Sequence, residues 1–227
     1  FAYFLSLANL LSAFAYMTDG TWNCGNVELS VITNSPETTD LNVINFAARY
    51  LLRAYFSYLD QNRDDRRGAV FRYYEYQRQG ENLDRSELSL HSKVNLIGPD
   101  IYVGSANADL RSYVLDTNNS VLIREAPVLR EAYLRWLGGR LNNPSLIKEH
   151  TGLFSAVSQE ELIEKDREYV RRVLGKLMPP DNPAISPVAE FIVELLVRLG
   201  DLSEKIIEEK KANSLNERKY DALFKLL

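Results

Sequence analysis

The chain has 227 residues, a formal net charge of −4 and 45% hydrophobic residues, a composition typical of a globular protein with one or two domains. Its mild acidity argues against nucleic-acid binding, which usually needs a basic surface. A single cysteine excludes an intramolecular disulfide framework, and the two histidines form no cluster with zinc spacing. We therefore expect neither a metal nor a cofactor.

The first part of the chain predicts three strands and two helices. Residues 1–17 are uncharged and apolar, which predicts a strand end followed by a buried helix, or alternatively the remnant of a signal segment. Residues 27–33 predict a strand that ends in a turn at residues 34–36. Residues 42–61 predict a helix because apolar side chains recur three and four positions apart, and alternation over residues 69–76 predicts the next strand.

The middle of the chain predicts three more strands and a helix. An apolar run covers residues 88–97, a short strand covers residues 101–103, and another strand covers residues 119–123. A helix with one apolar side is predicted over residues 126–141. Strands that alternate with helices indicate an α/β fold with a mainly parallel sheet flanked by helices.

The last part of the chain predicts helices alone. Residues 142–153 are a candidate boundary, and His150 within them is expected on the surface, outside any site. A capping box at residues 158–161 predicts a helix to about residue 177. Ser186 is a candidate N-cap for a helix to residue 198, and residues 202–211 predict another. We therefore expect an α/β lobe over residues 1–144 and a C-terminal helical extension over residues 145–227.

The segment HSKVNLIGPDIYVGSANADLRS, which begins at His91, carries the chemistry. In a strand, His91 and Lys93 project from one face, so a nucleophilic imidazole lies beside a cation that can hold a phosphate. Gly104 lets the backbone approach a ligand, and Ser105 and Asn107 add a hydroxyl and an amide. A His-x-Lys pair alone is weak evidence, but the joint pattern is specific and suits a phosphate without a metal.

This segment resembles the signature of the phospholipase D superfamily, in which His-x-Lys is followed by an Asp and then by Gly-Ser-x-Asn. Asp109, Arg111 and Ser112 continue the match. The resemblance implies a phospholipase D-like fold and an enzyme that cuts or exchanges phosphodiesters through a covalent phosphohistidine. It also implies that His91, Lys93 and Asn107 are catalytic, with Lys93, Ser105 and Asn107 binding the phosphate.

The resemblance extends over residues 2–144 and is greatest for the second signature copy of bacterial cardiolipin-synthase-like phosphatidyltransferases. Asn34, Ser35 and Asp40 match the loop after the second strand of those proteins. In the family, two copies face each other across a pseudo-twofold axis, and this chain carries one. It is therefore expected to be a C-terminal half that needs an upstream segment or a second chain.

Two positions depart from the family pattern. Gly98 stands where an Asp usually follows the Lys, and the nearest acid is Asp100. Asn118 stands where a Glu usually bonds the catalytic His, and Asp116 shares its strand face. The candidates for orienting His91 are therefore Asp100, Asn118 and Asp116.

The expected function is phosphodiester cleavage or transfer on a phospholipid at a membrane surface, by a peripheral protein that is membrane-associated or cytoplasmic in a bacterium. One alternative is a phosphodiesterase nuclease, which a basic groove would support. The other is a catalytically weak binding or effector module of the same fold, which Gly98 and Asn118 motivate.

Overall fold

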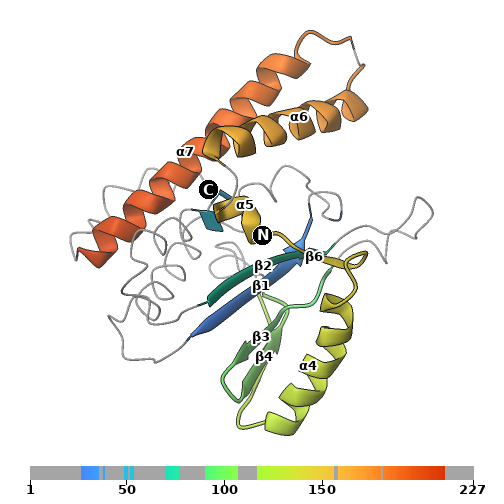
Figure 1. Ribbon diagram of the computed structural model, residues 1–227, viewed down its shortest axis with the longest axis vertical. Coiled ribbons are helices and arrows are strands. Elements are labelled where there is room, and N and C mark those ends of the chain that lie inside the picture. The colour runs from blue at the N-terminus through green and yellow to red at the C-terminus, as the bar shows by residue number, and fades with distance from the viewer. Residues whose placement is uncertain are drawn as a thin grey trace.

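The computed structural model describes residues 27–35, 38, 49–50, 52–53, 70–76, 90–106, 117–155, 158–179 and 181–212. It is a mixed α/β structure with two small sheets. Along its length, the α6–α7 pair lies at one end, the first sheet in the middle, and the second sheet with α4 at the other end (Figure 1). The predicted segment over residues 1–17 and most of the predicted helix over residues 42–61 lie outside the described residues.

The first sheet has the order β1-β2-β6, where β1 is Glu28–Asn34, β2 is Val70–Tyr76 and β6 is Ile147–Glu149. β1 and β2 are parallel, whereas β6 runs antiparallel to β2. β2 buries every second side chain, as expected for a strand with one face on a core. The ring of Phe154, in α5 (Gly152–Ser155), packs 5.1 Å from that of Tyr73.

β6 lies beyond the predicted domain boundary at residue 144. Ile147 is buried, and the His150 amide donates to the Tyr73 carbonyl oxygen at 2.7 Å. The segment that was expected to begin a helical extension therefore completes the first sheet instead. A strand of three residues is too short to show a periodic pattern, which is why the sequence did not indicate it.

The second sheet is an antiparallel meander of β3 (Val94–Ile97), β4 (Asp100–Gly104) and β5 (Ser120–Ile123), followed by α4 (Pro127–Leu141). Gly98 and Pro99 form the β3–β4 turn, and Gly98 has a φ of +56°. A two-residue turn of this kind joins antiparallel strands only. In the part of the chain that the structure describes, β1–β2 is thus the single parallel pair, where a mainly parallel sheet was expected.

Two long helices pack against each other. α6 (Gln159–Leu177) begins as predicted, with the Ser158 hydroxyl accepting from the Glu161 amide at 3.1 Å. α7 (Ile185–Lys211) is continuous, so the prediction of two helices with Ser186 as an N-cap is wrong. Tyr50 lies against Gly200, where an added Cβ would meet the Tyr50 side chain at 3.4 Å. Packing therefore compensates for the weak helix propensity of this glycine.

The α6–α7 interface has an apolar centre and a charged rim. Glu190 of α7 pairs with Arg167 and Arg171 of α6 at 2.8 and 2.7 Å. The buried residues of the cluster are Tyr50, Val170, Leu174, Ala189, Val193 and Leu196. Among the helices in the described ranges, none combines the length and apolar character needed to cross a membrane.

Candidate functional site

His91 and Lys93 lie just before β3, on an exposed segment. The Lys93 ammonium donates to the carbonyl oxygen of His91 at 2.8 Å, and the Gly104 amide donates to the Lys93 carbonyl oxygen at 3.1 Å. β3 starts only at Val94, so His91 and Lys93 precede the strand and do not share a strand face. Backbone pairing with Gly104 brings the His-x-Lys pair beside the Gly-Ser pair.

The structure also brings Ser105 and Asn118 together. The Ser105 hydroxyl donates to Asn118 Oδ1 at 3.0 Å and accepts from the Asn119 amide at 3.1 Å. A hydroxyl has one proton, so Ser105 cannot donate to a phosphate while it donates to Asn118. In this arrangement the Asn118 amide oxygen accepts from Ser105, whereas the sequence suggested His91 as its partner.

Gly104 is needed for a close contact within the sheet. A Cβ at this position would lie 2.7 Å from the Ser120 Cβ and 3.0 Å from the Asn119 carbonyl oxygen. Distances below 3.0 Å between such atoms require a shift of the backbone or of the neighbouring strand. The sequence suggested that a ligand would approach the backbone at Gly104, whereas in the structure it is β5 that lies close to this glycine.

Asp100 lies at the turn end of the β3–β4 hairpin. It pairs with Ile97, and its Oδ1 accepts from the Glu125 amide at 2.8 Å. Glu125 has a φ of 50°, a left-handed conformation that costs energy for a residue with a Cβ. Asp100 thus holds the strained connection into α4. His91 lies before the other end of β3, so the structure does not bring these two residues together.

The remaining predicted site residues, Asn107 and Asp116, lie outside the described residues. The same holds for Asp40, Asp109, Arg111 and Ser112. The described part of the site therefore consists of His91, Lys93, Ser105 and Asn118. Within the described ranges, no group of three or more His, Cys, Asp or Glu side chains is placed to hold a metal.

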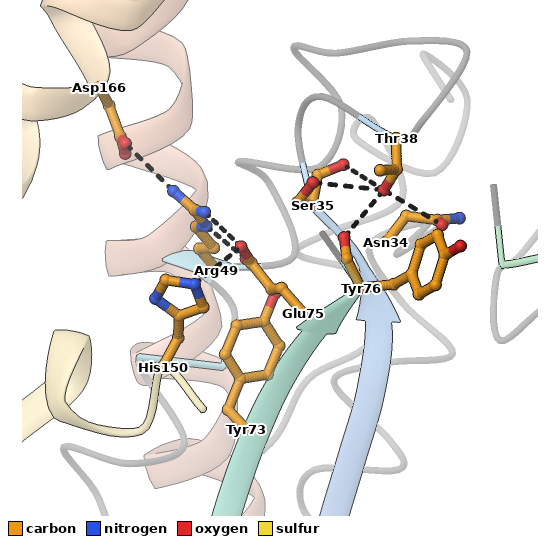
Figure 2. Close-up of polar contacts among 9 residues, drawn as sticks. All are labelled: Asn34, Ser35, Thr38, Arg49, Tyr73, Glu75, Tyr76, His150 and Asp166. Atoms are coloured by element: carbon orange, nitrogen blue, oxygen red, sulfur yellow. Dashed lines mark hydrogen bonds and ion pairs between the residues drawn. The ribbon is translucent and has the colours of Figure 1, made fainter. Parts of the chain in front are cut away.

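A buried polar network that the sequence did not indicate lies between β2 and α6 (Figure 2). The Arg49 guanidinium donates to both carboxylate oxygens of Glu75, at 2.7 and 2.6 Å, and lies 3.7 Å from Asp166 Oδ1. The Tyr73 hydroxyl donates to Glu75 Oε1 at 2.8 Å. His150 Nε2 is 3.7 Å from Glu75 Oε2, and its side chain is 18% exposed, so His150 is half-buried where a surface position was expected.

The network shifts the protonation equilibria of its members. Burial raises the pKa of Asp166 to about 6, although Arg49 acts in the opposite direction. Burial opposes the Arg49 charge, yet the hydrogen bonds that Arg49 donates to Glu75 hold the pKa of Arg49 above its usual value. Burial, with the Glu75 charge, raises the pKa of Tyr73. The alternation of β2, which puts Tyr73 and Glu75 on the same buried face, is the one sequence feature that could have drawn attention to this network.

Comparisons of the chain with protein-family models, with curated proteins and with solved structures return no match. The resemblance to the phospholipase D superfamily therefore rests on the residues quoted above.

Proposed function

We propose that this chain is one signature-bearing half of a phospholipase D-like enzyme that cleaves or exchanges a phospholipid phosphodiester. The observation that supports the proposal is the arrangement of His91, Lys93 and Ser105 at one exposed end of the second sheet, joined by the bond between the Gly104 amide and the Lys93 carbonyl oxygen. This arrangement provides a nucleophilic imidazole and a cation, two of the groups that phosphoryl transfer to a side chain requires.

In the proposed reaction, an imidazole nitrogen of His91 attacks phosphorus, and the bond from phosphorus to the leaving alcohol oxygen breaks. The leaving alkoxide takes a proton from an acid on the complementary half. Water or a second alcohol, deprotonated by that same group, then attacks phosphorus and breaks the phosphorus–nitrogen bond. Lys93 offsets the negative charge of the phosphoryl oxygens in both steps. Neither step needs an oxidant or a reductant.

Trapping of the covalent intermediate tests this proposal. The chain, as a dimer or together with its complementary half, is mixed with vesicles that contain a fluorescent phosphatidylglycerol. The reaction is quenched in base, in which a phosphohistidine is stable, and the adduct is mapped by peptide mass spectrometry. We expect a phosphatidyl adduct at His91 that His91→Ala abolishes without a change in melting temperature.

His150→Gln is the matched control because His91 and His150 are the only histidines of the chain. It should retain both the adduct and the turnover. An adduct at His150, or turnover that survives in His91→Ala, would contradict the assignment of His91.

A second function, phosphate binding without turnover, is favoured by one observation. The Asn118 amide, where a charged carboxylate would orient the imidazole, accepts a hydrogen bond from Ser105. A binding or effector module would bind the same vesicles but form no adduct at His91, so the trapping experiment separates the two functions.

A further inference from the structure

The segment that carries His91 is anchored by a side chain from the first sheet. Asn34 is the last residue of β1. Its Oδ1 accepts from the Leu90 amide at 2.6 Å, and its Nδ2 donates to the Leu90 carbonyl oxygen at 2.9 Å. A carboxamide has both a donor and an acceptor, so one side chain satisfies both backbone groups of Leu90. The Asn34 side chain thus bonds to the backbone of Leu90, the residue before His91, in the way that a neighbouring strand would.

Buried contacts hold Asn34 in place (Figure 2). The Thr38 hydroxyl lies 3.3 Å from Asn34 Oδ1 and 3.1 Å from the Tyr76 carbonyl oxygen. The Ser35 amide also donates to the Tyr76 carbonyl oxygen, at 3.1 Å, and both Ser35 and Thr38 are buried. The turn after β1 is therefore fixed to the end of β2, and it offers Asn34 to Leu90 in a defined orientation.

Two anchors then enclose the exposed His91. On one side Asn34 holds Leu90, and on the other the Gly104 amide bonds to the Lys93 carbonyl oxygen. His91 and Ser92 between them are exposed and belong to no strand. Among the described residues, Asn34 is therefore the anchor on the N-terminal side of His91.

We propose that Asn34 is a positioning residue for His91, which it holds at the carboxyl end of β1 through the backbone of Leu90. This inference rests on the proposed function for its catalytic consequence, although the anchor itself is independent of it. A displacement of about 1 Å in a reacting group costs on the order of 10²-fold in rate. Asn34 therefore acts on the chemistry without contact with the substrate.

The test compares Asn34→Ala with Asn34→Asp in the full chain. Asn182→Ala is the matched control because Asn182 also accepts from a backbone amide, that of Ala184 at 2.9 Å, but lies at the turn before α7. The first measurement is the hydrogen exchange of the Leu90 amide by NMR. We expect exchange to accelerate about tenfold or more in Asn34→Ala. Asn34→Asp, which keeps the acceptor, should retain most of the protection, and Asn182→Ala should retain all of it.

The second measurement follows the His91 imidazole signal during a titration with inorganic phosphate. His91→Ala identifies this signal, since the chain has two histidines. We expect Asn34→Ala to alter the His91 imidazole signal. It should also weaken the apparent phosphate affinity roughly tenfold, because the segment that carries His91 is no longer held in its binding conformation. In the active species, kcat should fall about 10²-fold with a much smaller change in KM.

The outcomes separate this inference from the proposed function. Unchanged exchange at Leu90 in Asn34→Ala would overturn the anchor. Faster exchange with an unchanged His91 signal and an unchanged phosphate titration would overturn the positioning role. If the wild-type chain forms no adduct and shows no turnover even as a dimer or with its complementary half, the proposed function fails, but the exchange and the His91 signal still decide whether Asn34 positions His91.

Discussion

At the scale of single residues, Lys93 links the nucleophile to the rest of the site. Its ammonium bonds to the His91 carbonyl oxygen, and its own carbonyl oxygen accepts from Gly104. The charge therefore stays beside His91. An ammonium acts on a phosphate as a point charge with three donors, so its removal affects phosphate binding and the transition state together.

Lys93→Ala should reduce turnover by about 10²-fold or more, because a donor at the developing phosphoryl charge is lost. The measurement is the rate of fluorescent phospholipid conversion by the active species. Lys148→Ala, which removes an exposed lysine from β6, is the control and should leave the rate unchanged. Equal rates in wild type and Lys93→Ala would show that the phosphate is held elsewhere.

At the scale of elements, the second sheet depends on two glycines with different roles. Gly98 adopts a positive φ in the β3–β4 turn, whereas Gly104 lets β4 and β5 approach at Ser120. A glycine at position 98 thus allows a tight hairpin. The nearest carboxylate, that of Asp100, lies at the turn end, where it accepts a hydrogen bond from the Glu125 amide.

Gly104→Ala should lower the free energy of unfolding by about 1–3 kcal/mol, the usual cost of overpacking. Gly139→Ala is the matched control, because a Cβ there meets nothing within 4 Å, and in a helix it should stabilise by about 0.5–1 kcal/mol. Urea unfolding of the two variants measures the difference. A Gly104→Ala protein as stable as wild type would mean that β4 and β5 do not approach as described.

At the scale of the whole molecule, the buried polar network joins three separate parts of the chain. Arg49 precedes Tyr50 of the α6–α7 core, Glu75 belongs to the first sheet, and Asp166 belongs to α6. Asp166 Oδ2 has no hydrogen-bond partner among the described residues, and Glu75 already engages Arg49 through two hydrogen bonds. Burial of the Asp166 carboxylate outweighs the opposing effects of Arg49 and Tyr50, which is why the pKa of Asp166 is raised.

Asp166→Asn should change how stability depends on pH. Because the Asp166 pKa is raised from 3.8 to about 6, the folded protein binds this proton more tightly than the unfolded chain. The resulting stabilisation is complete below about pH 4 and is lost as the pH rises through about 6, a decline of about 3 kcal/mol. Denaturant unfolding between about pH 4 and pH 7 should show this decline in wild type and lack it in Asp166→Asn.

Glu168→Gln, which removes an exposed acid from the same helix, is the control and should retain the wild-type decline. If Asp166→Asn and wild type lose stability in parallel as the pH rises, Asp166 is not the group that titrates.

Oligomeric state provides a further prediction at the molecular scale. The chain has one His-x-Lys pair, and the leaving alkoxide needs a proton from a second group. A strict monomer should therefore be inactive, and activity should appear on dimerisation or on addition of the complementary half. Sedimentation velocity beside the lipid assay measures this. An active species that sediments as one chain would contradict the two-histidine mechanism.

The sequence by itself determined the local elements and the candidate chemistry. Alternation located β2, the capping residue Ser158 located the start of α6, and the His-x-Lys and Gly-Ser spacing identified the segment around His91 and Ser105. The predictions of β2 and of the start of α6 are confirmed, because side-chain periodicity and helix capping depend on neighbours in sequence.

Only the tertiary structure decided which distant residues meet. Asn34 binds Leu90 across 56 positions, Arg49 binds Glu75, and β6 joins β2 beyond the expected boundary. Tyr50 also packs against Gly200 within one long helix, α7, where the sequence predicted two helices. Such contacts depend on long-range geometry and on burial, which periodicity within a single segment does not encode.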